Sequence, residues 1–480
     1  MAFTLCRIIF FIISIIGLSF SIPIATAIFC HEYFVIPSFL IPMIVSLILG
    51  AMTLFFFRNK KSRLTIRSSF AAVALAWISA SLFGAIPLYF SGAIPNFTDA
   101  FFESVSGFTT TGATTLSEIE KLPRSINLWR CLSHWLGGMG IVALTVALMP
   151  VLGVGGFQLI KAETTGPEKG KFTPKITTTA KILWFIYLGM TLIQTALLKI
   201  AGMDFIDALC HAFSTLGTGG FSTRNASIGA YNSAAIEWIC FVFMFLAGIN
   251  FSLYYYFFTR NFSEIKCNSE LKAYIWINII SIAAIAVVQA SSYGGFFKSL
   301  RFSAFQTATI LTTTGFSTAD YTKWKSASQI VILMLLFIGG MSGSTSGGVT
   351  VIRRDELNKQ FKNEILKMIH PHGVFSIRLN QQTGRKDVVF SVSAFFFLYF
   401  SFVILTAFFT SFFGLDMQTS FTGALTMIGN CGPAFGALGP SNNCGWLAAP
   451  VKWWYSFAMI AGRLELFTLF IFLTPAYWKK

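Results

Sequence analysis

The sequence predicts an all-α integral membrane protein in which four similar helical units follow two additional N-terminal membrane helices. Three observations predict this class. The 480 residues are 55% hydrophobic and only 11% charged, whereas soluble domains carry roughly 25% charged residues. Apolar runs along the chain are long enough for helices to cross about 30 Å of hydrocarbon. Four internal segments repeat one pattern, and each lies between two such runs.

Ten apolar runs predict ten membrane spans. They cover residues 5–30, 38–57, 69–91, 131–155, 181–203, 235–259, 273–290, 328–352, 388–413 and 451–474. The first run is longer than the apolar region of a signal peptide and lacks a small-x-small cleavage site, so we count it as a span.

The positive charge of the chain gives the orientation of the spans. The formal net charge is +16, and Lys and Arg gather in loops on one side of the predicted spans: 20 of them lie there, against 7 in the opposite loops. The richest segment, 353–386, carries 8. The positive-inside rule places these loops and both termini in the cytoplasm. Because no basic stripe is interleaved with stacking aromatics, we expect no nucleic-acid partner.

The repeated segments align without gaps. They read DAFFESVSGFTTTGAT (99–114), DALCHAFSTLGTGGFS (207–222), FSAFQTATILTTTGFS (302–317) and TSFTGALTMIGNCGPA (419–434). A glycine fills one column, at Gly112, Gly220, Gly315 and Gly432, and a small hydroxyl stands six residues earlier, at Ser106, Ser214, Thr309 and Thr426. The predicted unit is a helix, a short half-helix, an extended loop and a helix.

A second glycine column extends the repeat into the helix that follows each loop. It contains Gly138, Gly248, Gly340 and Gly462. The predicted organisation is two N-terminal helices at 1–64 and four units at 65–160, 161–262, 263–386 and 387–480.

The four loops are expected to surround one central pore. Irregular backbone at membrane depth persists only where it is buried in protein or lines a wet cavity. Glycine permits positive φ, so a Thr-x-Gly stretch can aim successive carbonyls inward. Rings of carbonyl oxygens replace the hydration shell of an alkali cation, and the C-terminal ends of the half-helices favour a cation.

These features resemble the TrkH/KtrB family of bacterial potassium-uptake proteins. The resemblance rests on the four units, the loops SGFTTTGAT and TTTGFST, and the glycine-rich interruption near 339–348. The two additional N-terminal helices are more similar to TrkH than to KtrB. The resemblance implies potassium uptake across the bacterial inner membrane, with potassium as the transported ligand and no bound cofactor or enzymatic activity. It also implies a homodimer that works with a cytosolic, TrkA-like subunit binding NAD or ATP.

The resemblance further implies a selectivity filter with one glycine per repeat, which the carbonyls of the preceding residues would line. Its residues are Thr110, Thr111, Gly112, Thr218, Gly219, Gly220, Thr313, Thr314, Gly315, Asn430, Cys431 and Gly432. The fourth copy, Asn430-Cys431-Gly432-Pro433, departs most from the others, so fourfold symmetry is least secure there.

The eighth apolar run is interrupted by five glycines, each costing about 1 kcal/mol relative to alanine in a helix. We expect a non-helical gate beneath the filter, and the alternative is a packing kink. The expected gate residues are Gly339, Gly340, Gly343, Ser344, Thr345, Ser346, Gly347 and Gly348.

Arg463 lies near the middle of the last run, where a charge is costly and a functional role is the default hypothesis. It could bind gate carbonyls and repel cations that stay below the filter. The alternative is an ion pair with Glu465 or Glu103.

Other polar residues predict ordinary structural roles. Asp99 and Asp207 start the first two half-helices, where an N-cap is expected. His134, His211 and Asn250 are expected to form hydrogen bonds between helices.

The eight cysteines show no paired spacing of a zinc or disulfide framework, and only Cys431 and Cys444 form a pair that deserves testing.

Competing functions remain open at this level. A sodium-permeable, or sodium- or proton-coupled, transporter of the same architecture is the main alternative. A membrane enzyme modifying lipid or polymer would need acids and histidines converging on a groove, and a signalling receptor would not need four filter loops.

Overall fold

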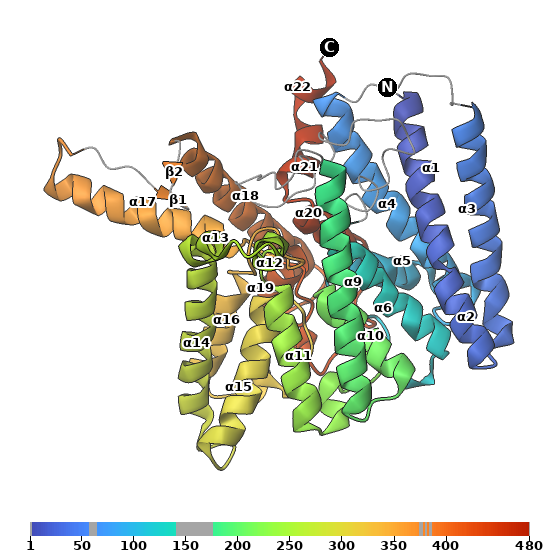
Figure 1. Cartoon of the computed structure of the whole chain (residues 1–480), viewed down its shortest axis with the longest axis horizontal. Helices are drawn as coiled ribbons and strands as arrows, with labels where there is room; N and C mark the ends of the chain where they lie inside the picture. Colours follow the sequence, from blue (N-terminus) through green and yellow to red (C-terminus); the bar gives the residue numbers. More distant parts are fainter. Residues whose placement is uncertain are drawn as a thin grey trace.

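The computed structural model describes residues 2–56, 65–140, 176–373, 378–379, 382–383 and 386–479. Within these ranges the regular secondary structure is α-helical, apart from short 3₁₀ turns and two antiparallel two-residue strands, β1 (Arg378–Leu379) and β2 (Gln382–Thr383), and loops connect the helices. The all-α class is therefore confirmed (Figure 1).

The N-terminal helices form a separate layer beside the repeats. They are α1 (Ala2–Ser19), α2 (Ser21–Phe29) and α3 (Ile36–Phe56). α1 and α3 approach closely because small residues face each other, as is usual between membrane helices. A Cβ on Gly17 would overlap the Ser46 hydroxyl, and Ser14 Oγ donates to Ser46 O at 3.0 Å.

Each repeat contains an outer helix, a half-helix and an inner helix. The outer helices are α4 (Ile66–Phe90), α9 (Ile176–Ile200), α14 (Ser269–Gln289) and α18 (Lys386–Ser411). The half-helices are α5 (Phe97–Phe108), α10 (Phe205–Leu216), α15 (Phe296–Leu311) and α19 (Met417–Ile428). The inner helices are α6 (Arg124–Gly138), α11 (Ala234–Ala247), α16 (Ser326–Leu336) and α20 (Ala449–Arg463). In every repeat the half-helix packs between the outer and the inner helix.

Further helices continue from the inner ones. They are α12 (Phe251–Phe258), α13 (Phe262–Cys267), α17 (Val351–Ile369), α21 (Phe467–Phe470) and α22 (Pro475–Trp478). α17 extends away from the bundle (Figure 1).

The expectation of an unbroken span was wrong for the runs 235–259 and 451–474, which bend sharply, whereas the eighth run is interrupted as expected. Among the described residues, six helices are long and apolar enough to cross a membrane, or up to eight if two bent pairs count as spans. The pair α11 and α12 bends by 91°, and α20 bends by 107° against the helix at Phe467–Leu473. α16 stops after 11 residues. α6 ends at Gly138. The part of the expected span 131–155 that follows residue 140 lies outside the described residues.

The second glycine column accounts for these breaks. α6 and α20 end at or directly after a column glycine, and α11 ends directly before one. Because glycine has no side chain, the inner helices can pack closely against the C-terminal ends of the half-helices. A Cβ on Gly462 would overlap the Ile428 carbonyl oxygen, and one on Gly138 would lie 2.6 Å from the Gly217 Cα. The helices therefore break at the level where the half-helices end.

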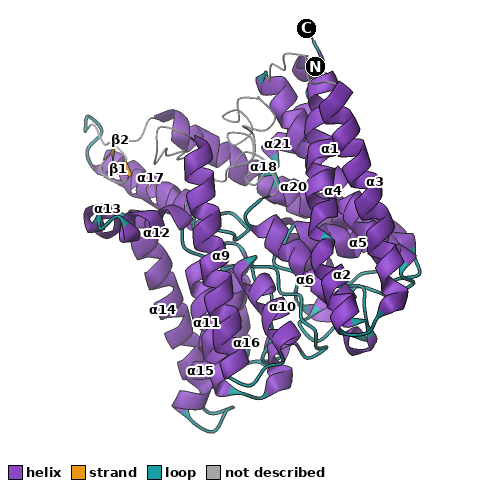
Figure 2. Ribbon diagram, turned by 45° about the vertical axis from the view of Figure 1, so that its right-hand side comes forward, coloured by secondary structure: helices purple, strands orange, loops and turns teal. Residues whose placement is uncertain are grey.

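Successive repeats meet in cyclic order. The inner helix of one repeat packs against the half-helix of the next, in the pairs α6 with α10, α11 with α15, and α20 with α5. Loops run through the middle of the bundle between these helices (Figure 2), and both termini lie at the same end of the molecule. The predicted repeat boundary at 160 and 161 lies outside the described residues, and the other domain boundaries stay predictions.

Candidate functional site

Each half-helix ends in the same way, and its end leads into a filter segment. The filter segments are 110–112, 218–220, 313–315 and 430–432. The first residue of each lies in the left-handed region, with φ of 56° at Thr110, 53° at Thr218, 54° at Thr313 and 54° at Asn430. Threonine rarely adopts this conformation, and each case costs ~1–3 kcal/mol. Its recurrence at equivalent positions indicates that the surrounding structure imposes it.

The backbone pattern at these ends is a Schellman motif, the usual helix stop with a left-handed residue. The amide of Thr111 donates to Ser106 O at 2.9 Å, and that of Thr110 donates to Gly107 O at 3.1 Å. The first of these bonds, from an amide to the carbonyl five residues earlier, recurs in the other repeats: from Gly219 to Ser214, from Thr314 to Thr309, and from Cys431 to Thr426. The hydroxyl column of the sequence thus marks the residues whose carbonyls close the half-helices.

The column glycines bring the four segments together in a closed ring. A Cβ on Gly112 would overlap Gly219 O, and one on Gly220 would overlap Thr314 O. A Cβ on Gly315 would lie 2.5 Å from Cys431 O, and one on Gly432 would overlap Thr111 O, which returns to the first repeat. Their φ values of 78° to 86° also require glycine. Each filter glycine therefore lies against the carbonyl of the residue before the next filter glycine.

A cavity of about 130 Å³ opens on one side of this ring. All four filter glycines line it, together with polar groups of the loops that follow, such as Asn225, Asn442 and Asn443. A single space shared by all four glycines places the filter segments around one axis.

The gate loop, residues 337–350, covers the other side of the ring. It has no helix, and Gly339, Gly343 and Gly348 have φ of 78°, 75° and 78°. The expected interruption of the helix is therefore present. The amide of Gly347 donates to the filter hydroxyl Thr313 Oγ1 at 2.7 Å, and a Cβ on Gly347 would lie 2.5 Å from Gly429 O. The gate loop thus contacts the third and fourth repeats at the ends of their half-helices.

Arg463 joins the gate loop to the first repeat. Its Nη1 donates to Thr345 O at 3.0 Å and to the filter hydroxyl Thr110 Oγ1 at 3.2 Å. Its Nη2 donates to Gly137 O at 2.7 Å and to Gly138 O at 3.0 Å. The expected contact with a gate carbonyl is therefore formed.

The two carboxylates considered as alternative partners of Arg463 hold other arginines. Glu465 pairs with Arg353 at 2.8 Å, and Glu103 pairs with Arg130 at 2.6 Å.

One buried carboxylate that the sequence did not single out connects the gate loop to the start of α17. Glu270 Oε1 accepts the amides of Ser342 at 2.7 Å and Ile352 at 3.1 Å. Glu270 lies in the first turn of α14 and is 3% exposed. An acidic residue opening an apolar run was visible in the sequence, but its partners come from a segment more than 70 positions away.

The N-cap expectation for two aspartates was wrong. Asn96 caps α5, while Asp99 pairs with Lys452 at 2.6 Å. Asp204 occupies the N-cap position of α10, and Asp207 pairs with Arg224 at 3.3 Å. Both aspartates stand in the first turn of the helix, where the Asp99 side chain reaches α20 and the Asp207 side chain reaches the loop after the second filter segment.

Of the three residues expected to form hydrogen bonds between helices, His134 does so, whereas His211 bonds a loop serine and Asn250 caps its own helix. His134 contacts Gly107 O at 2.7 Å through Nδ1, and its Nε2 accepts the Phe221 amide at 3.2 Å. It therefore links α5, α6 and the second filter loop. His211 contacts Ser222 Oγ at 2.9 Å, and Asn250 caps α12.

All eight cysteines are free, so Cys431 and Cys444 form no disulfide.

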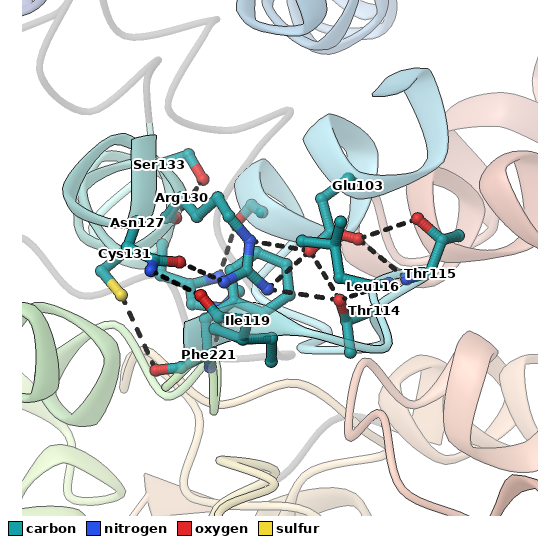
Figure 3. A network of polar contacts seen from close by, with 12 residues as sticks. Glu103, Thr114, Thr115, Leu116, Ile119, Asn127, Arg130, Cys131, Ser133 and Phe221 are labelled. Atoms are coloured by element: carbon teal, nitrogen blue, oxygen red, sulfur yellow. Dashed lines mark hydrogen bonds and ion pairs between the residues drawn. The ribbon is translucent and has the colours of Figure 1, made fainter. Parts of the chain in front are cut away.

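A second missed feature lies behind the first filter segment. Glu103 and Arg130 are fully buried, and their carboxylate and guanidinium connect α5, α6 and the loop that leaves the filter (Figure 3). Within the described residues, no group of three or more His, Cys, Asp or Glu side chains could hold a metal ion.

Comparison with known proteins gives one consistent result. Residues 35–279 and 282–480 match the TrkH family, described as cation transport protein. The chain is 38% identical to the Trk system potassium uptake protein TrkH of Halomonas elongata, over 92% of each chain. It is 36% identical to the TrkH protein of Escherichia coli K12, over 91% of each.

The fold is also similar to a solved structure. The crystal structure of the potassium transporter TrkH from Vibrio parahaemolyticus superimposes with a TM-score of 0.86 at 34% identity, covering 98% of this chain and 99% of that one.

Proposed function

Because the chain belongs to the TrkH family of cation transport proteins, we propose that it takes up potassium across the bacterial inner membrane through the ring of filter segments. The relatives are named as potassium uptake proteins, and the chain is a multi-pass membrane protein. The proposal assigns this activity to named atoms of the present chain.

The closed contact of four glycines with four carbonyls carries the proposal. The oxygens of Thr111, Gly219, Thr314 and Cys431 each lie beside a glycine of the neighbouring repeat. An alkali cation that loses its water needs several such oxygens at once, and a ring of carbonyls provides them. The carbonyls of Thr110, Thr218, Thr313 and Asn430 form the next level in this proposal.

The half-helices support a cation over an anion. The C-terminal ends of all four point toward the ring, since each leads directly into a filter segment. The partial negative charge of a helix C-terminus stabilises a cation nearby. Uptake needs no ATP in this chain, because an inside-negative potential contributes about 2.3 kcal/mol per 100 mV to each entering monovalent cation.

The gate loop closes the cytoplasmic side of the filter in the described conformation. Two hydrogen bonds to filter hydroxyls support this closed state, from Gly347 to Thr313 and from Arg463 to Thr110. Opening requires the gate loop to release Thr313, which accepts from Gly347, and Arg463, which donates to Thr345 O. Residues 339–348 and Arg463 therefore form the gate in this proposal.

A cytosolic partner would act through α17, which follows the gate loop directly and is rich in Lys and Arg. A TrkA-like subunit that binds NAD or ATP and pulls on this helix would withdraw the gate loop. A homodimer is part of the same proposal, and both partners are taken from the family.

Liposomes containing only this purified protein test the proposed function. With potassium more concentrated inside the liposomes than outside, we expect uptake of external rubidium. External potassium should suppress this uptake far more strongly than external sodium does. Equal suppression by both ions would favour the sodium-permeable alternative, and no uptake above protein-free liposomes would contradict a transport path in this chain.

A further inference from the structure

A buried ion pair lies directly behind the first filter segment. Arg130 donates to Glu103 Oε1 through Nε at 2.9 Å and Nη2 at 2.6 Å, and both side chains are at most 1% exposed. Asn127 Oδ1 accepts a third bond from the same guanidinium at 3.0 Å. Desolvating two charges is costly, so such a pair is weak evidence for stability by itself. The position of this ion pair behind the first filter segment indicates a role beyond stability.

The carboxylate of this pair holds the backbone that leaves the filter. Thr114 Oγ1 donates to Glu103 Oε1 at 2.8 Å, and the Thr115 amide donates to Oε2 at 2.9 Å. These residues follow Gly112 by two and three positions. Because the Thr111 amide bonds Ser106 at the other end, the first filter segment is attached to α5 on both sides of its glycine (Figure 3).

The guanidinium extends this support to the second repeat. Arg130 Cζ lies 4.3 Å from the centroid of the Phe221 ring, and Phe221 directly follows the filter residue Gly220. The Phe221 amide also bonds His134, one turn further along α6. One face of α6 therefore supports two neighbouring filter segments.

The other repeats use the same half-helix position with less polar chemistry. The alignment places His211, Gln306 and Gly423 opposite Glu103. His211 contacts Ser222 Oγ at 2.9 Å, and Gln306 Nε2 donates to Ala319 O at 3.0 Å. In the fourth repeat, a Cβ on Gly423 would lie 2.7 Å from the Tyr455 hydroxyl, which fills the position. Of these four positions, only the one in the first repeat carries a charge.

We infer that Glu103 and Arg130 are positioning residues for ion selectivity, which fix the carbonyls of the first and second filter segments at the spacing that potassium needs. This inference rests on the proposed function and extends it. A buried ion pair behind the first repeat alone among these four positions gives the filter an asymmetry that its four similar glycines conceal.

The variants separate positioning from simple stability. Glu103→Gln keeps the size of the side chain and removes its charge. The double variant Glu103→Gln/Arg130→Gln leaves no unpaired charge buried, and so remains usable if the single variant fails to fold. Thr114→Val keeps the ion pair and the bond from the Thr115 amide, and removes the hydroxyl that donates to Glu103 and accepts from Arg130. The control is Glu237→Gln, because Glu237 is a buried carboxylate paired with Arg301 at 3.1 Å between α11 and α15.

Two measurements are made on each variant in the full protein. In amide hydrogen exchange, residues 110–116 should exchange about tenfold faster in both Glu103 variants, as expected for losing hydrogen bonds to a charged group. In liposomes, the preference for potassium over sodium as a competitor of rubidium uptake should fall by about the same factor. Thr114→Val should change both in the same direction but less, and the control should change neither.

Unchanged exchange and unchanged preference in the folded variants would overturn the inference, as would equal changes in the control. If the wild-type protein itself did not discriminate between potassium and sodium, the proposed function would fail. The exchange of residues 110–116 would still decide whether Glu103 holds the filter segment.

Discussion

At the scale of single residues, the filter segments contain threonines and glycines whose backbones both lie in the left-handed region, with positive φ. The threonines tolerate their conformation because tertiary contacts hold their side chains: Thr313 accepts from Gly347, and Thr110 accepts from Arg463. Thr218 donates to the carbonyl of its own neighbour, Gly217. The glycines have a different requirement, since the space of a Cβ is already occupied by the carbonyl of the next repeat.

A pair of matched glycines separates close approach from backbone strain. Gly315 and Gly414 both have φ of 86°, but a Cβ on Gly315 meets Cys431 O at 2.5 Å, whereas Gly414 has nothing within 4 Å. Alanine at either position should cost ~1–2 kcal/mol of backbone strain. We expect Gly315→Ala to abolish rubidium uptake and Gly414→Ala to retain it, measured in liposomes at equal protein content. Retained uptake in Gly315→Ala would argue against the ring as the ion path.

At the scale of elements, the inner helices matter because they break. A continuous helix through residues 326–352 would leave no backbone to reach the filter, whereas the gate loop presents an amide to Thr313 and a carbonyl to Arg463. Glu270 binds the amide of Ser342 within the gate loop and that of Ile352 in the first turn of α17. Between these two anchored amides, the gate loop is held against the filter segments and Arg463 by a few hydrogen bonds.

Shortening this segment should open the path. Deleting residues 343–347 removes Gly347 and Thr345 and, with them, the contacts to Thr313 and Arg463, so we expect faster rubidium uptake. The initial rate in liposomes measures the effect, and size-exclusion chromatography controls for intact protein. Combining the deletion with Gly315→Ala should return uptake to background, because the added flux must still cross the filter. A slower rate in the intact deletion variant would refute the gate assignment.

At the scale of the whole molecule, the chain closes four units around an axis and places its termini together. Adjacent repeats contact each other through inner helices and half-helices, and both termini lie at the same end (Figure 2). The basic segments and the termini are expected in the cytoplasm by the positive-inside rule. The native cysteines allow this orientation to be tested.

Thiol labelling in intact cells tests the orientation. Cys267 is exposed and lies between the predicted spans 235–259 and 273–290, on the proposed cytoplasmic side, so a membrane-impermeant maleimide should label it only after permeabilisation. Asn442→Cys, in a background lacking Cys30, should react in intact cells because Asn442 lines the cavity on the opposite side of the ring. Labelling of Cys267 before permeabilisation would reverse the assigned topology.

Much of the architecture could be predicted because it repeats. The column of Gly112, Gly220, Gly315 and Gly432 and the interrupted run near Gly340 are local patterns that recur or break a strong periodicity. The partners of isolated charges could not be predicted in this way. Glu103 was considered for Arg463 and in fact holds Arg130, and Asp99 reaches Lys452 from a position 353 residues away. Membrane burial makes such pairing necessary but does not identify the partner.

The sequence by itself determined the membrane class, the four-unit plan and the positions where the backbone must leave the helix, because hydrophobic length and glycine placement are properties of neighbouring residues. Only the tertiary structure decided that each filter glycine meets a carbonyl of the next repeat, that the inner helices bend beneath them, and that one repeat carries a buried ion pair. These features depend on contacts between residues that are separated in the sequence, from 27 positions for Glu103 and Arg130 to more than 300 for Gly432 and Thr111, and only the folded chain brings them together.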